Sequence, residues 1–224
     1  MIRFAAPRSG DLGMAKSNRT KFGKSLSAKQ FEVKFRPYAI GIGNVVLSWN
    51  RLQDTLGLLF WWFSGRRSDM VMLKLWHTSN NDRAQRGLLR ALIEAVPETA
   101  FDSRSQARAD IIWLLGKADH FSEGRNDAIH SPYEFDYQTL RIGVDGRFLN
   151  PKAEKLAGKN LLDEFKMYAN RADAMRGFAL LIYQAIIFSE QPWPERPRSL
   201  LSDRELNPKA KTHQKTAKVP LRQH

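Results

Sequence analysis

Arg125, Asn126 and His130 stand close together in the segment Glu123-Gly124-Arg125-Asn126-Asp127-Ala128-Ile129-His130-Ser131-Pro132. Histidine titrates near neutral pH, so its imidazole can accept or donate a proton during a reaction. Arginine carries a permanent charge on a planar group whose N–H donors can hold a phosphate as negative charge accumulates. The asparagine amide can orient the histidine or the phosphate through a hydrogen bond. These residue types make Arg125, Asn126 and His130 the catalytic candidates of this chain.

Other patterns that carry chemistry are missing from the sequence. Gly41-Ile42-Gly43 is too short to be a phosphate-binding loop, and no pair of histidines or cluster of carboxylates has the spacing of metal ligands. The chain contains no cysteine, which excludes disulfides and thiolate metal sites. The remaining histidines are predicted to be surface or terminal residues: His77, His120, His213 and His224. We therefore expect neither a metal ion nor a cofactor.

The Arg125-Asn126-x-x-x-His130 pattern resembles the signature of the HEPN superfamily, the higher eukaryotes and prokaryotes nucleotide-binding domains. That signature is an arginine, four to six residues and a histidine, usually with a polar residue directly after the arginine. The resemblance extends loosely over residues 40–190 and includes an early long helix with a tryptophan, here Trp49. One departure is Ser131-Pro132 after the histidine, where many members have a small glycine-containing continuation.

This resemblance implies an activity and a set of partners. Active members of the superfamily are metal-independent endoribonucleases, in which the 2′-OH of RNA attacks the adjacent phosphate and leaves a cyclic phosphate. It implies a homodimer with a composite active site, and it suggests a toxin or phage-defence effector with an antitoxin-like protein as a possible partner. RNA is the expected substrate, and Arg125, Asn126 and His130 are the expected site.

Spacing alone creates a geometric problem for this site. Positions five apart in a helix are rotated by roughly 140°, so Arg125 and His130 share no face unless the helix breaks near Gly124 or Pro132. A site shared across a twofold axis removes the difficulty, because each subunit then presents its pair to its mate. We expect one composite site per dimer.

Hydrophobic periodicity predicts an all-α fold. Apolar residues recur at spacings of three and four over about residues 43–63, 82–95, 102–121 and 160–188, and Gly124 interrupts the third pattern. Residues 70–76 fit a helix or a strand. After Pro132 the pattern alternates up to Asp145-Gly146, which predicts a hairpin with a brief return strand at residues 147–149. The expected architecture is a helical bundle of about four main helices with a small β-hairpin insertion.

Charge is concentrated at the two ends of the chain. The net charge is +13, of which +7 lies in residues 1–38 and +5 in residues 191–224. We predict a helical domain over residues 39–190 between two flexible basic tails, with residues 1–36 disordered and Pro37 closing that segment. Such tails either attract polyanions such as RNA or act as solvated arms. No apolar run is long enough to span a membrane and no secretory signal is present, so a cytoplasmic location is expected.

Two readings without catalysis remain open. Arg125 can pair with Asp119, Glu123 or Asp127 while His130 caps the helix, which would leave a structural motif or a non-catalytic RNA- or nucleotide-binding module. Alternatively, Phe60, Trp61, Trp62 and the apolar end of the last helix can form a protein-interaction surface.

Overall fold

The computed structural model describes residues 27–66, 68–79, 81–101, 104–136, 141–144 and 151–206, with Arg204 described by its backbone alone. The prediction of an all-α bundle with a small hairpin is confirmed. Its four main helices are α1 (Ala28–Phe63), α3 (Asp82–Ala95), α4 (Ala107–His130) and α6 (Leu161–Ile187). The shorter elements are α2 (Val71–Thr78), α5 (Pro151–Leu156), α7 (Asp203–Leu206), the 3-10 turns Glu98–Phe101 and Arg198–Leu200, and the strands β1 (Tyr133–Asp136) and β2 (Arg141–Val144).

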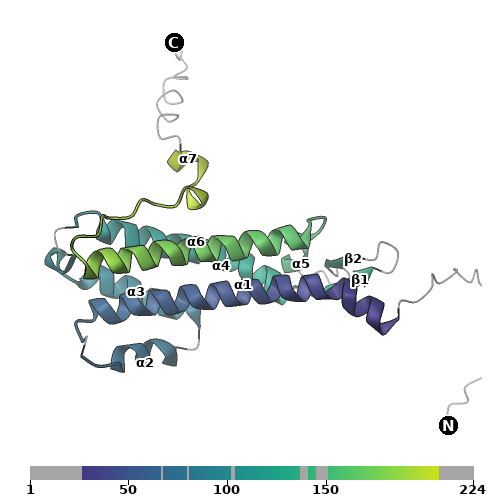
Figure 1. Ribbon diagram of the computed structural model, residues 1–224, viewed down its shortest axis with the longest axis horizontal. Helices are drawn as coiled ribbons and strands as arrows, with labels where there is room; N and C mark the ends of the chain where they lie inside the picture. The colour runs from purple at the N-terminus through teal and green to yellow at the C-terminus, as the bar shows by residue number, and fades with distance from the viewer. Residues whose placement is uncertain are drawn as a thin grey trace, which may run out of the picture.

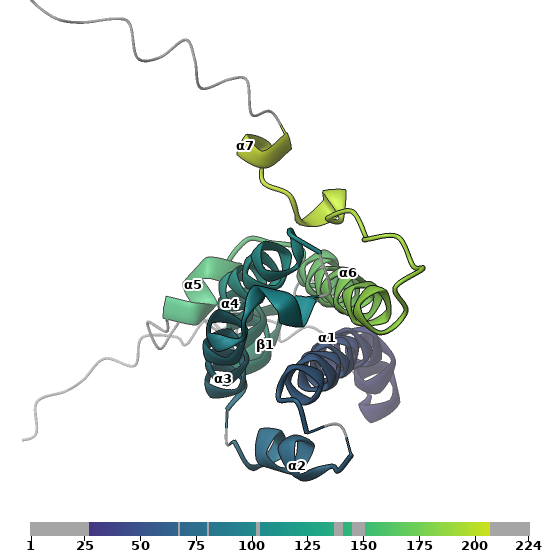
Figure 2. The same cartoon turned by 90° about the vertical axis from the view of Figure 1, so that its left-hand side faces the viewer.

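The four main helices pack around a common core. α1 contacts α6 and α3, and α4 contacts the same two helices, so that the four enclose one apolar interior (Figures 1 and 2). Each helix contributes apolar side chains that are buried in it, among them Trp49, Leu52, Leu56, Leu89, Ile93, Ile111, Leu115, Met175, Phe178 and Ile182. A smaller cluster lies where the hairpin and α5 meet one end of α1 and α6. The aromatic run at the end of α1 belongs to the main core, with Phe60 only 7% exposed and Trp62 packed against it.

α1 is much longer than its apolar pattern indicated. The prediction that it begins near Gly43, after a segment closed by Pro37, is wrong, because the helix begins at Ala28 and contains Pro37. Ser27 starts it with a capping box: its hydroxyl accepts from the amide of Gln30 at 3.3 Å, and the Gln30 side chain accepts from the amide of Ser27 at 3.0 Å. In this added helical segment, Phe31 packs edge-on against Phe135 of β1. Residues 1–26, also assigned to the N-terminal tail, lie outside the described residues.

α4 continues to His130 without a break, so the prediction that Gly124 interrupts the third helix is wrong. Gly124 has a packing role. A Cβ atom at this position would lie 2.7 Å from Cε1 of Tyr168, closer than carbon atoms pack. The glycine therefore lets α4 approach the Tyr168 side chain of α6 while the helical hydrogen bonding continues through it.

The hairpin exists, but its turn is not at Asp145-Gly146 as predicted. β1 and β2 pair antiparallel with Tyr133 opposite Val144 and Phe135 opposite Ile142. The connection therefore falls at residues 137–140, which, like the expected return strand at 147–149, lie outside the described residues. Both alternating apolar segments are strands because their side chains share one face that packs on the small cluster, where Ile142 is buried.

The segment after Pro192 packs on α4, although residues 191–224 were predicted to form a flexible tail. Trp193 Nε1 and Arg196 Nε both donate to the Asp110 carboxylate, at 2.7 and 2.6 Å. Farther along, Glu205 of α7 accepts from Trp113 Nε1 at 2.6 Å and from Lys117 Nζ at 2.8 Å. These contacts hold residues 193–206 to the bundle, while residues 207–224 lie outside the described part of the chain. Within that part, no helix is long and apolar enough to cross a membrane.

Candidate functional site

A polar cleft of about 490 Å³ opens between the beginning of α3 and the second half of α4. The α4 side of the cleft is lined by Arg125 and Asn126, together with Asp119, His120, Ser122 and Glu123. The α3 side is lined by Asp82, Arg83 and Arg86, together with Asn81, the residue before the helix. Two of the three predicted site residues thus lie in one cleft. His130 is not among the lining residues.

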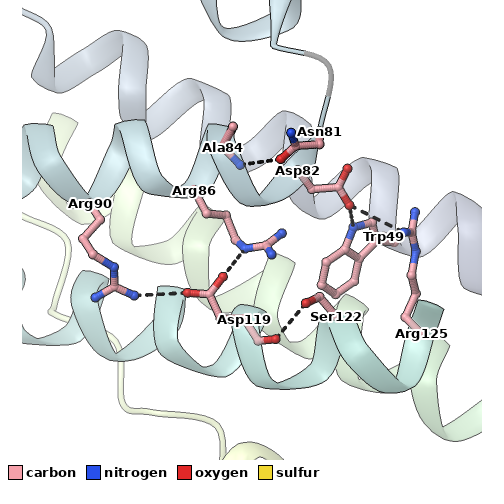
Figure 3. Close-up of polar contacts among 9 residues, drawn as sticks. All are labelled: Trp49, Asn81, Asp82, Ala84, Arg86, Arg90, Asp119, Ser122 and Arg125. Carbon is pink, nitrogen blue, oxygen red and sulfur yellow. Dashed lines mark hydrogen bonds and ion pairs between the residues drawn. The ribbon is translucent and has the colours of Figure 1, made fainter. Parts of the chain in front are cut away.

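Arg125 of α4 is held by residues from two other helices (Figure 3). Its Nη1 atom lies 3.6 Å from Oδ2 of Asp82, and its guanidinium lies over the indole of Trp49, 5.4 Å from the ring centroid. The acidic partner of Arg125 is therefore Asp82 of α3, not one of the acids of α4. Asp82 also accepts from Trp49 Nε1 at 2.6 Å, so that one carboxylate joins α1, α3 and α4.

Asn126 is connected to Arg125 directly. Its Oδ1 atom accepts a hydrogen bond from Arg125 Nη1 at 2.7 Å. This bond fixes which end of the amide is the oxygen, and it leaves the NH₂ group of Asn126 as a donor on the cleft side of α4. The predicted role of Asn126, to orient the histidine or the phosphate, stays a prediction, since the partner of its oxygen here is Arg125.

Arg86 is a second arginine of the cleft and lies close to the same tryptophan as Arg125. Its Nε atom donates to Oδ1 of Asp119 at 2.8 Å, and Arg90 reaches Oδ2 of the same carboxylate at 3.4 Å. The Arg86 guanidinium lies 5.5 Å from the centroid of the Trp49 indole, which therefore packs against both Arg86 and Arg125. Asp119 and Asp82 together counter a group of arginine side chains.

The two arginines keep donors without an acceptor. Nη1 of Arg86 and Nε of Arg125 are buried and have no hydrogen-bond partner among the residues that the structure describes. Burial lowers the pKa of Arg125 from its usual value; the nearby Asp82 raises it in part, and the charge of Arg86 lowers it further. The cleft thus contains arginine donors that are buried and incompletely hydrogen-bonded, beside the carboxylates that pair with them.

His130 lies on another side of α4. It stands in the last turn of the unbroken helix and is exposed, five residues after Arg125 and hence rotated by roughly 140° from it. It does not cap the helix, because the C-cap is Ser131, whose amide and hydroxyl both donate to the carbonyl of Asp127. Tyr133 fixes the same turn by donating its hydroxyl to the carbonyl of Ala128. Within one chain, Arg125 and Asn126 come together and His130 remains apart.

Sequence reasoning missed several residues of the cleft. Asp82 was predicted only as a possible helix start, where Asn81 is the N-cap and accepts from the amide of Ala84 at 2.7 Å. His120 was placed on the surface, which is correct, but it also lines the cleft. Arg86 and Arg90 were not singled out, although their spacing of four places both on one face of α3.

Comparisons with known proteins add no further assignment. No known protein family, curated protein or solved structure matches the chain. Among the described residues, no three His, Asp or Glu side chains gather in an arrangement that could hold a metal ion. The functional conclusion therefore depends on the geometry of α4 and its cleft.

Proposed function

We propose that this protein is a metal-independent endoribonuclease of the HEPN type, active as a homodimer. The observation that carries the proposal is the arrangement along α4: a hydrogen-bonded Arg125–Asn126 pair in a polar cleft, followed by an exposed histidine in the last turn of the same helix. The pair offers guanidinium and amide donors for a phosphate, and the histidine offers a proton-transfer group accessible to a large substrate.

The dimer follows from the angle between the two residues. Since Arg125 and His130 lie on different sides of one continuous helix, a single chain does not bring both to one phosphate. Two copies related by a twofold axis, with the ends of their α4 helices together, would place one pair opposite the other and form one composite site.

The reaction in that site would be an internal transfer. An imidazole of His130 accepts the proton of the RNA 2′-OH, and the 2′-oxygen forms a bond to the adjacent phosphorus. The bond from phosphorus to the 5′-oxygen breaks, and that oxygen takes up a proton from the second imidazole of the dimer. The products are a 2′,3′-cyclic phosphate and a 5′-hydroxyl, with Arg125 stabilising the charge on the phosphate oxygens.

The basic ends of the chain support an RNA substrate. Residues 1–38 and 191–224 carry +12 of the net charge of +13, and such segments bind nucleic-acid backbones through release of counterions. A toxin or phage-defence role with an antitoxin-like partner belongs to the same proposal.

The test is cleavage of cellular RNA by purified protein in excess EDTA. We expect fragments with cyclic-phosphate ends from the wild type, and a loss of rate of at least about 100-fold in Arg125→Ala and in His130→Ala. His77→Ala is the matched control, because His77 is also an exposed histidine in the last turn of a helix. Specific activity should rise with protein concentration through the range in which dimers form.

Two outcomes would reject the proposal. Equal cleavage by all variants would mean that the motif takes no part in the reaction. RNA binding without cleavage by any form would instead establish a non-catalytic RNA-binding module, the alternative favoured by the engagement of Arg125 with Asp82 and Trp49.

A further inference from the structure

The cleft contains more positive groups than the proposed reaction uses. Arg83 and Arg86 line it from α3, and neither belongs to the Arg125–His130 motif. Arg83 is exposed and has no ion-pair partner within the described part of the chain. Arg83 is therefore an exposed cation in the lining of the cleft, whereas Arg86 is a buried one.

The N-terminus of α3 opens into the same cleft. Asn81, Asp82 and Arg83 are its cap and first two residues, and all three are lining residues. The side-chain and backbone oxygens of Asn81 accept from the amides of Ala84 and Gln85. The two preceding amides, of Asp82 and Arg83, have no partner inside the helix, and such a group of free N–H donors favours an anion.

Arg86 gives an independent indication of a ligand. Its side chain is 3% exposed, and Nη1 has no hydrogen-bond partner. Figure 3 shows the free end of this guanidinium directed away from Asp119 and toward Trp49. A buried charged donor without an acceptor is unfavourable, and an oxygen-rich anion at the inner end of the cleft would supply the missing acceptor.

The carboxylates of the cleft do not cancel this attraction. Asp82 is engaged by Trp49 Nε1 and Arg125, and Asp119 by Arg86 and Arg90, so both charges are already countered. The remaining acid is Glu123, which is exposed at the rim. Its negative charge repels an anion, so removal of this charge should strengthen anion binding, whereas removal of an arginine should weaken it.

We propose that the cleft between α3 and α4 is a phosphate-binding site, in which Arg83, Arg86 and the first amides of α3 hold a phosphate group. The planar donors of arginine match phosphate oxygens in pairs, which lysine does not reproduce. The phosphate belongs either to an RNA backbone or to a free nucleotide. The site needs neither His130 nor a second chain, so it stands independently of the catalytic proposal.

Binding to the full-length protein tests this site at one fixed salt concentration. The probes are inorganic phosphate and adenosine 5′-monophosphate, followed by ³¹P NMR line broadening, and a 2′-O-methyl RNA oligonucleotide, followed by fluorescence anisotropy. The oligonucleotide has no free 2′-OH and is not cleaved, so failure of the ribonuclease proposal leaves the result intact.

We expect Arg83→Ala and Arg86→Lys each to weaken phosphate binding by about tenfold, the size of one lost charged hydrogen bond. Glu123→Gln should tighten it by a few-fold, because a repulsive charge is removed. Arg66→Ala is the matched control, since Arg66 is an exposed arginine that does not line the cleft.

The probes distinguish the two sources of the phosphate. Weaker binding of the oligonucleotide together with the small probes supports an RNA backbone, and an effect confined to the small probes supports a free nucleotide. Wild-type affinity of both Arg83→Ala and Arg86→Lys for all three probes would overturn the proposal. Because Arg83 is exposed, its variant keeps the test valid even if Arg86→Lys folds poorly.

Discussion

The indole Nε1 of Trp49 donates to Oδ2 of Asp82 at 2.6 Å, and this bond joins the middle of α1 to the first residue of α3. The same carboxylate oxygen lies 3.6 Å from Arg125 Nη1 of α4. Trp49 is buried, with 2% of its surface exposed, so its N–H requires an acceptor inside the protein. Asp82 therefore satisfies a core tryptophan and positions the arginine of the candidate site.

Asp82→Asn tests this double role. The amide oxygen can still accept from Trp49, but Arg125, whose side chain is only 18% exposed, loses its counterion. We expect the free energy of unfolding to fall by about 1–3 kcal/mol, as for a lost hydrogen bond between charged groups. Urea unfolding followed by circular dichroism measures this change. Asp54→Asn, at an exposed position of α1, is the control and should stay within about 0.5 kcal/mol of the wild type.

Gly124 and Gly116 of α4 should respond to alanine with opposite signs. A Cβ at Gly124 would meet the Tyr168 ring at 2.7 Å, whereas nothing lies within 4 Å of a Cβ at Gly116. Gly116→Ala should stabilise the protein by about 0.5–1 kcal/mol through helix propensity. Gly124→Ala should destabilise it by about 1–3 kcal/mol, because α4 or Tyr168 must move. Thermal unfolding of the two variants measures these changes in stability. A shift of both melting temperatures in the same direction would contradict the prediction of opposite signs.

Glu205 should make the attachment of α7 sensitive to acid. Hydrogen bonds from Lys117, Ser202 and Trp113 lower the pKa of this carboxyl well below its usual value. A group whose pKa is lowered on folding stabilises the folded state above its unfolded pKa, about 4.3, and this contribution is lost as the pH falls toward the lowered value. The stability difference between wild type and Glu205→Gln should therefore be largest above about pH 5 and shrink below pH 4.

Urea unfolding of wild type and Glu205→Gln at a series of pH values measures this dependence. Asp203→Asn, an exposed acid in the same helix, provides the control and should show no comparable difference. A difference between wild type and Glu205→Gln that stays constant from pH 7 to pH 3 would show that the carboxylate charge does not hold α7 in place.

Local sequence patterns were sufficient to predict those features of the fold that depend on contacts between neighbours in the sequence. The starts of α3 near Asp82 and of α6 near Asn160 were predicted, and there Asn81 and Asn160 cap the helices by accepting from amides two or three residues away. The all-α class followed from apolar spacing, since a helix buries the same side chains whichever partner covers it. Pro37 and Gly124 misled the prediction because each was given its usual local effect, whereas α1 continues through Pro37 from a capping box at Ser27, and Gly124 lets α4 pack closely against Tyr168.

By itself, the sequence determined that this is a helical protein with an arginine, an asparagine and a histidine near the end of one helix. Only the tertiary structure decided what surrounds them. Asp82 is 43 positions from Arg125 in the chain, and Trp49 is farther still, yet both contact its guanidinium. Contacts of this kind depend on how α1, α3 and α4 cross in space, which no local spacing encodes. For that reason the motif could be found in the sequence, while the cleft could not, nor could the buried Arg86 whose Nη1 atom has no acceptor among the described residues.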